Sequence, residues 1–345
     1  MKKFIFFRND RLGDFIILTN VIRAIKKKYK DSHISILCSP LNSSFIKRYK
    51  IVDQVHVYSK HISFLKKIEI LRKIISENYY ASFAVDGKSF SNLCNLLINS
   101  KYKLGLIYKY KFFNIWFSKP NFLYNYLFFN KSETFTSKKN LKKIEHLPSK
   151  FLSLGNFLGL KIKLKDRYFF ETNNNENLKF NKFKLRYLKK KYLLIHFDEK
   201  WNDILSINNK LFSSLLYLQK KTKKQLILTS YQNNFNYFKI LKKNINQYKN
   251  FANISIIENS NLFFFERLIN NSICSVSCHS GFLVQIAGSN NTNLIDIINK
   301  NDYNWYSSWK PLNTKHKFIF KSNKNIKKPI DAIFKDLSYA INSYL

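Results

Sequence analysis

Short apolar runs alternate along the chain with longer segments in which apolar residues recur every three or four positions. Such short runs are typical of buried strands, and the longer spacing is typical of helices that pack one face on a sheet. In the first half the predicted strands are Phe4–Phe7, His33–Ser39, Gln54–Tyr58, Ala81–Asp86 and YKLGLIY, and the predicted helices are Phe15–Lys28, Ser43–Tyr49, Ile62–Glu77, Ser91–Asn99 and His146–Leu160. This order predicts a parallel, doubly wound α/β sheet.

The same alternation restarts in the second half. The predicted strands are Tyr192–Phe197, Gln225–Ser230, Ala252–Glu258, Ser272–Cys278 and Thr292–Ile298, and the predicted helices are Asn209–Lys220, Asn234–Asn244, Leu262–Asn270, Gly281–Ala287 and Pro329–Leu345. Two sheets of this kind predict two domains that face each other, with a ligand cleft at the carboxyl ends of their strands.

A polar stretch of low complexity, ETNNNENLKFNKF, separates the two halves and is typical of a linker. We therefore expect an N-terminal domain over residues 1–170, a linker over 171–182, a C-terminal domain over 183–325 and a terminal helix over 326–345. The aromatic and basic segment Lys109–Lys143 has no clear period. It fits a flexible segment facing an acceptor, a lipid-contacting patch or ordinary core, and ordinary core is the interpretation we favour.

The charge is strongly positive, +39 from 60 Lys and Arg against 21 Asp and Glu. Codon drift towards Lys, Asn, Ile, Phe and Tyr explains much of it, and an anionic partner such as a bilayer surface, a phosphorylated glycolipid or nucleic acid is the functional alternative. No element typical of specific nucleic-acid recognition is present. No apolar run reaches membrane-helix length and Arg8 interrupts the first one, so we expect a cytoplasmic chain whose four cysteines are reduced thiols.

The sequence RNDRLGD joins the first predicted strand to the first predicted helix. Gly13 in the turn would let the backbone approach a ligand, and amides at a helix start can hold an anion. Asp14 falls in the first helical turn, where it is either a cap or dipole partner or a catalytic carboxylate, and the residues alone leave both open. Arg11 fits a surface ion pair with Asp10 or a place beside the ligand. The pattern is neither a dinucleotide fingerprint nor a P-loop.

Three further clusters follow strands of the second half. In IHFDEKWND, Lys200 suits a phosphate and Trp201 could stack a ring, although a capped, charged loop explains both. Thr229 and Ser230 end QLILTS, where they could meet a phosphate or ribose or simply form a polar strand end.

The last cluster is SCHSGFLVQIAG, in which a strand leads through His279, Ser280 and Gly281 into a helix. Exposed amides and a hydroxyl at that point suit a diphosphate. His279 is either a ligand contact for phosphate or acceptor or a buried, satisfied histidine. A Ser-His-Asp hydrolase is not favoured, because no G-x-S-x-G elbow occurs.

Taken over nearly its whole length, the chain resembles the heptosyltransferase-like glycosyltransferases, glycosyltransferase family nine. The resemblance is carried by RNDRLGDFIILTNVIRAIKKKYKDSHISILCSP at the start, by YYASFAVDGKSFSN, by IEHLPSKFLSLGNFLGL, by YLLIHFDEKW and by LINNSICSVSCHSGFLVQIAGSNNTNLIDI. Where the family shows Asp before Ser-Gly and a His downstream, this chain has His279 and Val284, and the family's H-P-G turn is His196-Phe197-Asp198.

The resemblance implies a GT-B fold, two Rossmann-like domains facing across a cleft, and inverting sugar transfer that needs no metal and no cofactor. It implies Asp14 as general base, Lys200 on the donor phosphate and Ser280 with Gly281 at the diphosphate. It also implies that the terminal helix packs back towards the N-terminal domain.

We therefore expect a metal-independent glycosyltransferase that moves a heptose or related sugar from a nucleotide-diphosphate sugar to a lipopolysaccharide-type or other cell-surface glycan. Its partners would be the nucleotide-sugar donor, a lipid-linked saccharide acceptor and the anionic inner-membrane surface, with no specific nucleic acid. The alternative is a noncatalytic protein of the same fold that binds nucleotide sugars or glycans.

Overall fold

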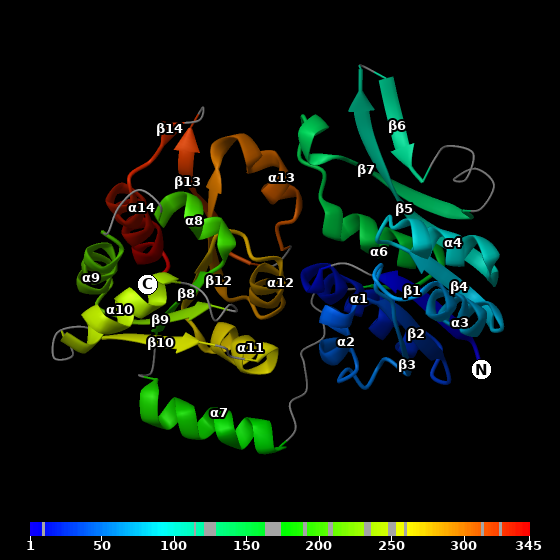
Figure 1. Cartoon of the computed structure of the whole chain (residues 1–345), viewed down its shortest axis with the longest axis horizontal. Coiled ribbons are helices and arrows are strands. Elements are labelled where there is room, and N and C mark those ends of the chain that lie inside the picture. Colours follow the sequence, from blue (N-terminus) through cyan, green and yellow to red (C-terminus); the bar gives the residue numbers. More distant parts are fainter. Residues whose placement is uncertain are drawn as a thin grey trace. The chain divides into compact units, whose positions relative to one another are not determined.

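A computed structural model describes residues 1–8, 11–113, 115–120, 129–162, 174–188, 192–205, 210–230, 236–247, 253–258, 261–311, 314–323 and 326–345. The chain divides into two compact units, Met1–Glu171 with Ser307–Trp309, and Thr172–Tyr306 with Lys310–Leu345. In each unit a central sheet is covered by helices (Figure 1). The main division at residue 171 lies where the linker is predicted to begin.

The sheet of the first unit is mostly parallel. Its strands are β1 (Lys3–Arg8), β2 (His33–Cys38), β3 (Gln54–Val57), β4 (Asn78–Ala84), β5 (Asn99–Phe112), β6 (Ile115–Lys119) and β7 (Lys131–Thr136). Their order is β3-β2-β1-β4-β5-β6 with β7 also paired to β5, and β6 runs antiparallel. The helices are α1 (Leu12–Lys28), α2 (Pro40–Ile46), α3 (Phe64–Ile75), α4 (Ser89–Leu97), η1 (Lys138–Asn140) and α6 (Leu147–Phe157).

The core of this unit explains why its strands appear in the sequence as continuous apolar runs. Residues Phe4 to Phe7 of β1 have no exposed surface, as a strand covered on both faces requires. Phe6 stacks on Phe83 of β4 with ring centroids 4.3 Å apart. The continuous apolar run therefore marks a central parallel strand, and the predicted doubly wound sheet is confirmed.

The second unit repeats the architecture with the strand order β10-β9-β8-β11-β12-β13-β14. Its strands are β8 (Tyr192–Phe197), β9 (Gln225–Ser230), β10 (Ile254–Glu258), β11 (Cys274–Ser277), β12 (Asn293–Asn299), β13 (His316–Asn323) and the short antiparallel β14 (Ile326–Lys327). Its helices are α7 (Asn174–Tyr187), η3 (Glu199–Trp201), α8 (Asn202–Leu205), α9 (Leu211–Thr222), α10 (Asn236–Gln247), α11 (Leu262–Asn271), α12 (Gly281–Ser289), η4 (Lys300–Asp302), α13 (Tyr303–Ser308) and α14 (Ile330–Asn342).

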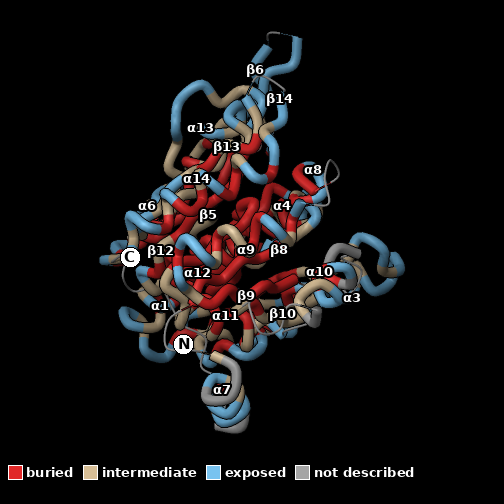
Figure 2. Tube along the Cα trace, turned by 90° about the vertical axis from the view of Figure 1, so that its left-hand side faces the viewer, coloured by how far each residue is buried: buried red, intermediate tan, exposed pale blue. Residues whose placement is uncertain are grey.

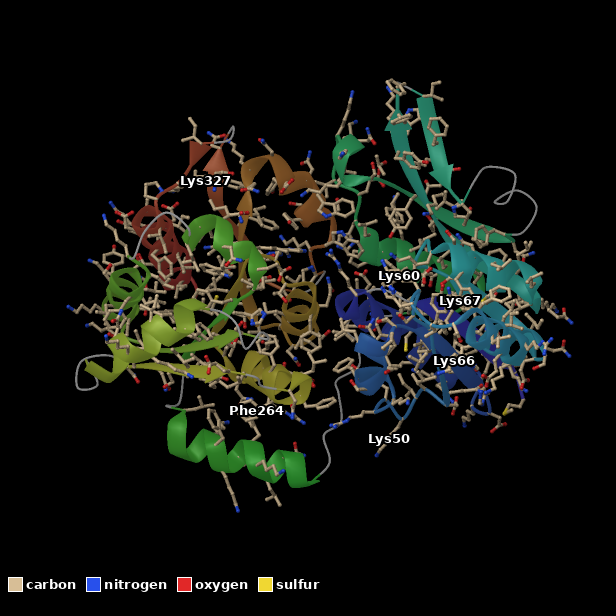
Figure 3. The ribbon with its side chains drawn as sticks, in the orientation of Figure 1. Lys50, Lys60, Lys66, Lys67, Phe264 and Lys327 are labelled. Atoms are coloured by element: carbon tan, nitrogen blue, oxygen red, sulfur yellow. The ribbon has the colours of Figure 1, made fainter. Side chains whose placement is uncertain are left out.

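Two segments of the second unit differ from or extend the sequence-based expectation. The terminal helix α14 packs on α9 and β13 within the second unit, and its apolar face, including Ile333, Phe334 and Leu337, belongs to that unit's core. The polar linker predicted over 171–182 overlaps α7, and the ring centroid of Phe180 in α7 lies 5.3 Å from that of Phe264 in α11. Figure 3 labels Phe264.

The segment Lys109–Lys143 differs from the expected ordinary core. The end of β5 and the whole of β6 are largely exposed (Figure 2), with Phe113 at 84% and Trp116 at 53%. The cysteines are buried thiols, as Cys38, Cys94, Cys274 and Cys278 show. Within the described ranges, no helix combines the length and apolar character needed to cross a bilayer.

Candidate functional site

In the first unit, Asp14 lies where β1 gives way to α1. Residues 9 and 10 lie outside the described ranges, which leaves the predicted ion pair of Arg11 with Asp10 outside them too. Arg11 is the exposed N-cap of α1 without a side-chain capping bond, and α1 begins at Leu12. Gly13 is therefore helical and buried, so it is not the tight-turn residue that the sequence suggested.

Asp14 is held by an arginine from the preceding strand. Arg8 has no exposed surface, and one of its terminal nitrogens donates to Asp14 Oδ2 while the other donates to the carbonyl of Val85. Its guanidinium also lies 5.2 Å from the ring centroid of Phe151. The Asp14 side chain keeps 17% of its surface exposed. The ion pair occupies Oδ2 of Asp14 and fixes the direction of the carboxylate.

The neighbouring strand β4 ends in a turn organised by Asp86. Its two carboxylate oxygens accept hydrogen bonds from the amide of Lys88, at 2.9 Å, and the hydroxyl of Ser91, at 2.6 Å. Gly87 has φ +62°, and a β-carbon there would lie 2.7 Å from the Tyr108 ring. Asp86 is thus committed to the turn, and Asp14 is the better candidate for chemistry at this edge.

In the second unit, the structure joins two clusters that are far apart in sequence. Lys200, in η3 after β8, directs its ammonium to the carbonyl of His279 at 2.7 Å. His279 lies directly before Ser280, the N-cap of α12, so a cation with 30% of its side chain exposed lies beside a helix N-terminus. Asp198 caps η3 by accepting from the amide of Lys200, and burial raises the pKa of Asp198 to about 6 although the Lys200 charge opposes that shift.

The start of α12 offers backbone amides to the outside. Ser280 is the N-cap but its side chain makes no capping bond, and its own amide donates to Ser277 Oγ at 3.1 Å. A β-carbon on Gly281 would meet no atom within 4 Å, so the first helical residue faces open space. First-turn amides have no acceptor within their own helix, and the helix dipole favours an anion there. Together with Lys200, Ser280 and Gly281 form a corner suited to phosphate oxygens.

His279 is fixed from behind by a buried acid. Its backbone is left-handed, with φ +61°, and its Nδ1 lies 2.7 Å from Asp296 Oδ2. Asp296 also accepts from Ser277 Oγ at 2.9 Å and from His316 Nε2 at 2.9 Å.

Burial would raise the pKa of Asp296, but the charges and hydrogen bonds of His279 and His316 outweigh it and lower that pKa. Burial lowers the pKa of His279 more than the pairing with Asp296 raises it.

The other predicted donor-site residues lie deeper. Trp201 has no exposed surface, packs on Phe197 and donates from Nε1 to the carbonyl of His196 at 2.8 Å. Thr229 is equally buried, 3.1 Å from His196 Nδ1, and Ser230 is 2% exposed. Burial lowers the pKa of His196 to about 3. This packing runs against a stacking role for Trp201, since neither ring face is presented to a ligand.

Sequence reasoning did not single out Arg8 or His316 as site residues. An arginine at the end of an otherwise apolar strand was the available signal for Arg8, because a buried guanidinium requires an acidic or carbonyl partner. His316 lies in β13, a strand that the sequence analysis did not predict, and it reaches Asp296 through the pairing of β12 with β13.

No family model and no curated protein sequence matches the chain. Among solved structures, a glycosyl transferase family 9 protein from Veillonella parvula aligns with a TM-score of 0.71 at 11% identity, over 99% of this chain and 97% of that chain. The E. coli ADP-heptose LPS heptosyltransferase II aligns with a TM-score of 0.68 at 12% identity, over 100% and 98%. A UDP-GlcNAc 2-epimerase from Methanocaldococcus jannaschii aligns with a TM-score of 0.53 at 14% identity, over 98% and 99%. These likenesses establish the fold, which is the GT-B fold expected from the sequence.

Proposed function

We propose that the chain is an inverting glycosyltransferase that moves a heptose or related sugar from a nucleotide-diphosphate sugar to a lipid-linked saccharide. The observation that carries the proposal is the meeting of Lys200 with the open N-terminus of α12, on a fold shared with proteins named for transfer from ADP-heptose. The acceptor would be a lipopolysaccharide-type or other cell-surface glycan.

The second unit would bind the donor. Lys200, the Ser280 hydroxyl and the amide of Gly281 would hold the diphosphate, which gains negative charge as the sugar leaves. This preorganised positive potential would stabilise the leaving group, and the proposal requires no metal. His279 would accept a hydrogen bond from a donor hydroxyl, since its Nδ1 is bonded to Asp296. Thr229 and Ser230 would support the donor site from its buried side. We assign Trp201 no contact with the ligand.

The first unit would supply the base. The acceptor hydroxyl would form a bond to the anomeric carbon as the bond from that carbon to the diphosphate oxygen breaks, and Asp14 would take the hydroxyl proton. Attack opposite the leaving group inverts the anomeric centre. Arg8 would act as a positioning residue, because it fixes Asp14 without reaching the substrate itself. Arg11 and the backbone at Gly13 would lie on the acceptor side.

A lipid-linked acceptor would place the enzyme at the cytoplasmic face of the inner membrane as a peripheral protein. The net charge of +39 favours anionic lipid surfaces. The competing function is noncatalytic binding of nucleotide sugars or glycans. The departure at Val284 motivates it, because this fully buried side chain replaces a histidine in the pattern of the resembled family.

The test separates binding from transfer. Calorimetry with ADP, UDP and GDP and their sugars identifies the donor, and product formation is then followed with truncated-core lipopolysaccharides as acceptors. Asp14→Asn should lower turnover at least 100-fold, a typical contribution of a general base, and leave donor affinity within about threefold. Lys200→Met should weaken nucleotide-diphosphate binding at least tenfold, whereas the exposed control Lys220→Met should not.

Full turnover by Asp14→Asn would refute the base assignment. Donor binding without consumption, with every acceptor tried, would favour the noncatalytic alternative. Unchanged nucleotide affinity in Lys200→Met would remove the corner at α12 from the donor site.

A further inference from the structure

The end of β5 and the strand β6 form a two-stranded ribbon at the margin of the first unit (Figures 1 and 2). We call the described residues 110–113 and 115–117 the aromatic ribbon. Its strands are antiparallel, and Tyr110 pairs with Phe117 while Phe112 pairs with Ile115. The base is held firmly, because the carbonyl of Lys109 accepts from the Ser137 amide at 2.7 Å and the Lys111 amide donates to Asn140 Oδ1 at 2.9 Å.

One face of the aromatic ribbon is apolar. Directly paired residues share a face, so Tyr110, Phe112, Ile115 and Phe117 project on the same side. The ring centroids of Tyr110 and Phe117 are 5.8 Å apart, and those of Phe112 and Phe117 are 6.5 Å apart. Their exposed fractions are Tyr110 38%, Phe112 59%, Ile115 61% and Phe117 42%, and Phe113 at the turn reaches 84%.

This is a large apolar surface to leave in water. With side chains of about 200 Å² each, the aromatic ribbon exposes on the order of 600 Å², at the upper end of what monomeric proteins tolerate. Scattered exposed apolar residues need no explanation, but a continuous row of rings on a fixed ribbon indicates a binding surface.

The charge around the ribbon is of one sign. Lys111 pairs with Trp116 on the opposite face, where its ammonium lies 5.9 Å from the indole centroid. Lys109 and Lys119 flank the rings, and the sequence contains no Asp or Glu between Asp86 and Glu133. The adjoining helix η1 adds the exposed Lys138 and Lys139.

We propose that the aromatic ribbon docks on a bilayer that contains anionic lipid. Aromatic and apolar side chains on a basic background are the composition that favours the interface between head groups and acyl chains. Lysines around the rings complement lipid phosphates, whereas in a symmetric pair of chains they would face lysines of the same sign. The proposal names the surface for the peripheral association suggested above, yet its test needs neither donor nor acceptor, so failed transfer would leave it intact.

Vesicle co-sedimentation tests the docking with the full-length chain. Binding is compared on phosphatidylcholine vesicles and on vesicles with 30% phosphatidylglycerol. We expect clear binding only to the anionic vesicles, and at least a tenfold loss of affinity in the variant Phe112→Ser, Phe113→Ser, Trp116→Ser. Lys109→Gln with Lys111→Gln should also lose at least tenfold, because each lysine near the surface contributes about fivefold.

The controls alter equally exposed residues of the second unit. Ile326→Ser, Tyr339→Ser and Leu345→Ser together match the three apolar changes, and Lys220→Gln with Lys221→Gln matches the charge change. Circular dichroism confirms that each variant is folded. Equal vesicle binding by ribbon and control variants overturns the proposal, as does failure of the wild type to bind. A ribbon variant that changes only the oligomeric state in sedimentation would instead identify a second copy as the occupant.

Discussion

The ion pair between Arg8 and Asp14 should make a measurable contribution to the stability of the first unit. The perturbations are Arg8→Met, Asp14→Ala and the double variant. The Arg8 side chain is 1% exposed and the Asp14 side chain is 17% exposed. Each single change therefore leaves the other residue's charge without its partner, and these two charges differ in how far water can reach them. Asp14→Ala leaves a buried guanidinium without its carboxylate, which typically costs 3–5 kcal/mol. The Val85 carbonyl still accepts from Arg8, so we expect about 3 kcal/mol.

Arg8→Met strands the carboxylate instead, but the partial exposure of Asp14 lets water reach it. We expect about 2 kcal/mol for this variant, since an unpaired polar group costs about 1–3 kcal/mol. The double variant removes both charges and fills the guanidinium space with an apolar chain of similar length. It should therefore cost about 2 kcal/mol in total rather than the sum, which corresponds to a coupling of about 3 kcal/mol between the two residues.

Native-state hydrogen exchange is the appropriate assay, because the two units can unfold separately and a global midpoint would mix them. The amides of β1 and β4 report on the first unit, and those of β8 and β9 serve as an internal reference. Asp31→Ala, an exposed acid of the same unit, should change β1 protection by less than about 0.5 kcal/mol. Coupling should persist in 0.5 M salt, because buried pairs are weakly screened. A coupling below about 0.5 kcal/mol at either salt concentration would refute the buried-pair reasoning.

Two further predictions concern the second unit. Burial raises the folded-state pKa of Asp198 from 3.8 to about 6, so ionising this carboxyl lowers the free energy of unfolding as the pH rises through this range. In urea unfolding, Asp198→Asn should therefore raise the free energy of unfolding by up to about 3 kcal/mol above pH 6 and give no such gain below pH 4. An equal gain at pH 3.5 and pH 8 would contradict the burial argument. Trp201→Phe removes the hydrogen bond to the His196 carbonyl and leaves a cavity, so it should lower the free energy of unfolding in urea by about 2–3 kcal/mol. Nucleotide affinity measured by calorimetry should change less than threefold, and a tenfold loss of affinity would restore the stacking role.

The sequence was informative where burial follows from local pattern. Apolar runs such as Phe4–Phe7 identified central strands, and helices recurred between them, so the doubly wound sheets could be predicted. Packing partners could not be predicted in the same way. The spacing of α14 showed an apolar face, but only the folded chain shows that α9 and β13 cover it.

Some features of the candidate site also follow from local sequence pattern, and others depend on packing partners. Lys200 and Gly281 follow strand ends, and the carboxyl ends of neighbouring parallel strands meet at one edge, so their proximity was foreseeable. The pairing of β12 with β13, which joins Asp296 to His316, depends on strand order and register, and the sequence does not specify these. Trp201 illustrates the converse, since a ring at a strand end suits stacking and core packing equally until its burial is known.

The exchange at His279 can be understood through its neighbours. The aspartate of the resembled pattern would bring both a hydrogen-bond acceptor and a negative charge to the ligand. In this chain Asp296 lies 2.7 Å from Nδ1 of His279, and the tautomer that carries its proton on Nδ1 leaves Nε2 as an acceptor. The negative charge lies instead on the buried Asp296, whose carboxylate also accepts hydrogen bonds from Ser277 and His316.

In the proposed donor site, an imidazole in place of a carboxylate would keep a hydrogen-bond acceptor beside Lys200 and would avoid the repulsion between a carboxylate and a diphosphate. Val284 differs in kind, because it is fully buried within α12 and therefore serves the helix packing rather than a ligand. The residues around His279 thus keep a hydrogen-bond acceptor at this corner. A transferase and a noncatalytic nucleotide-sugar binder would both need such an acceptor, so turnover, and not donor binding, has to distinguish the two functions.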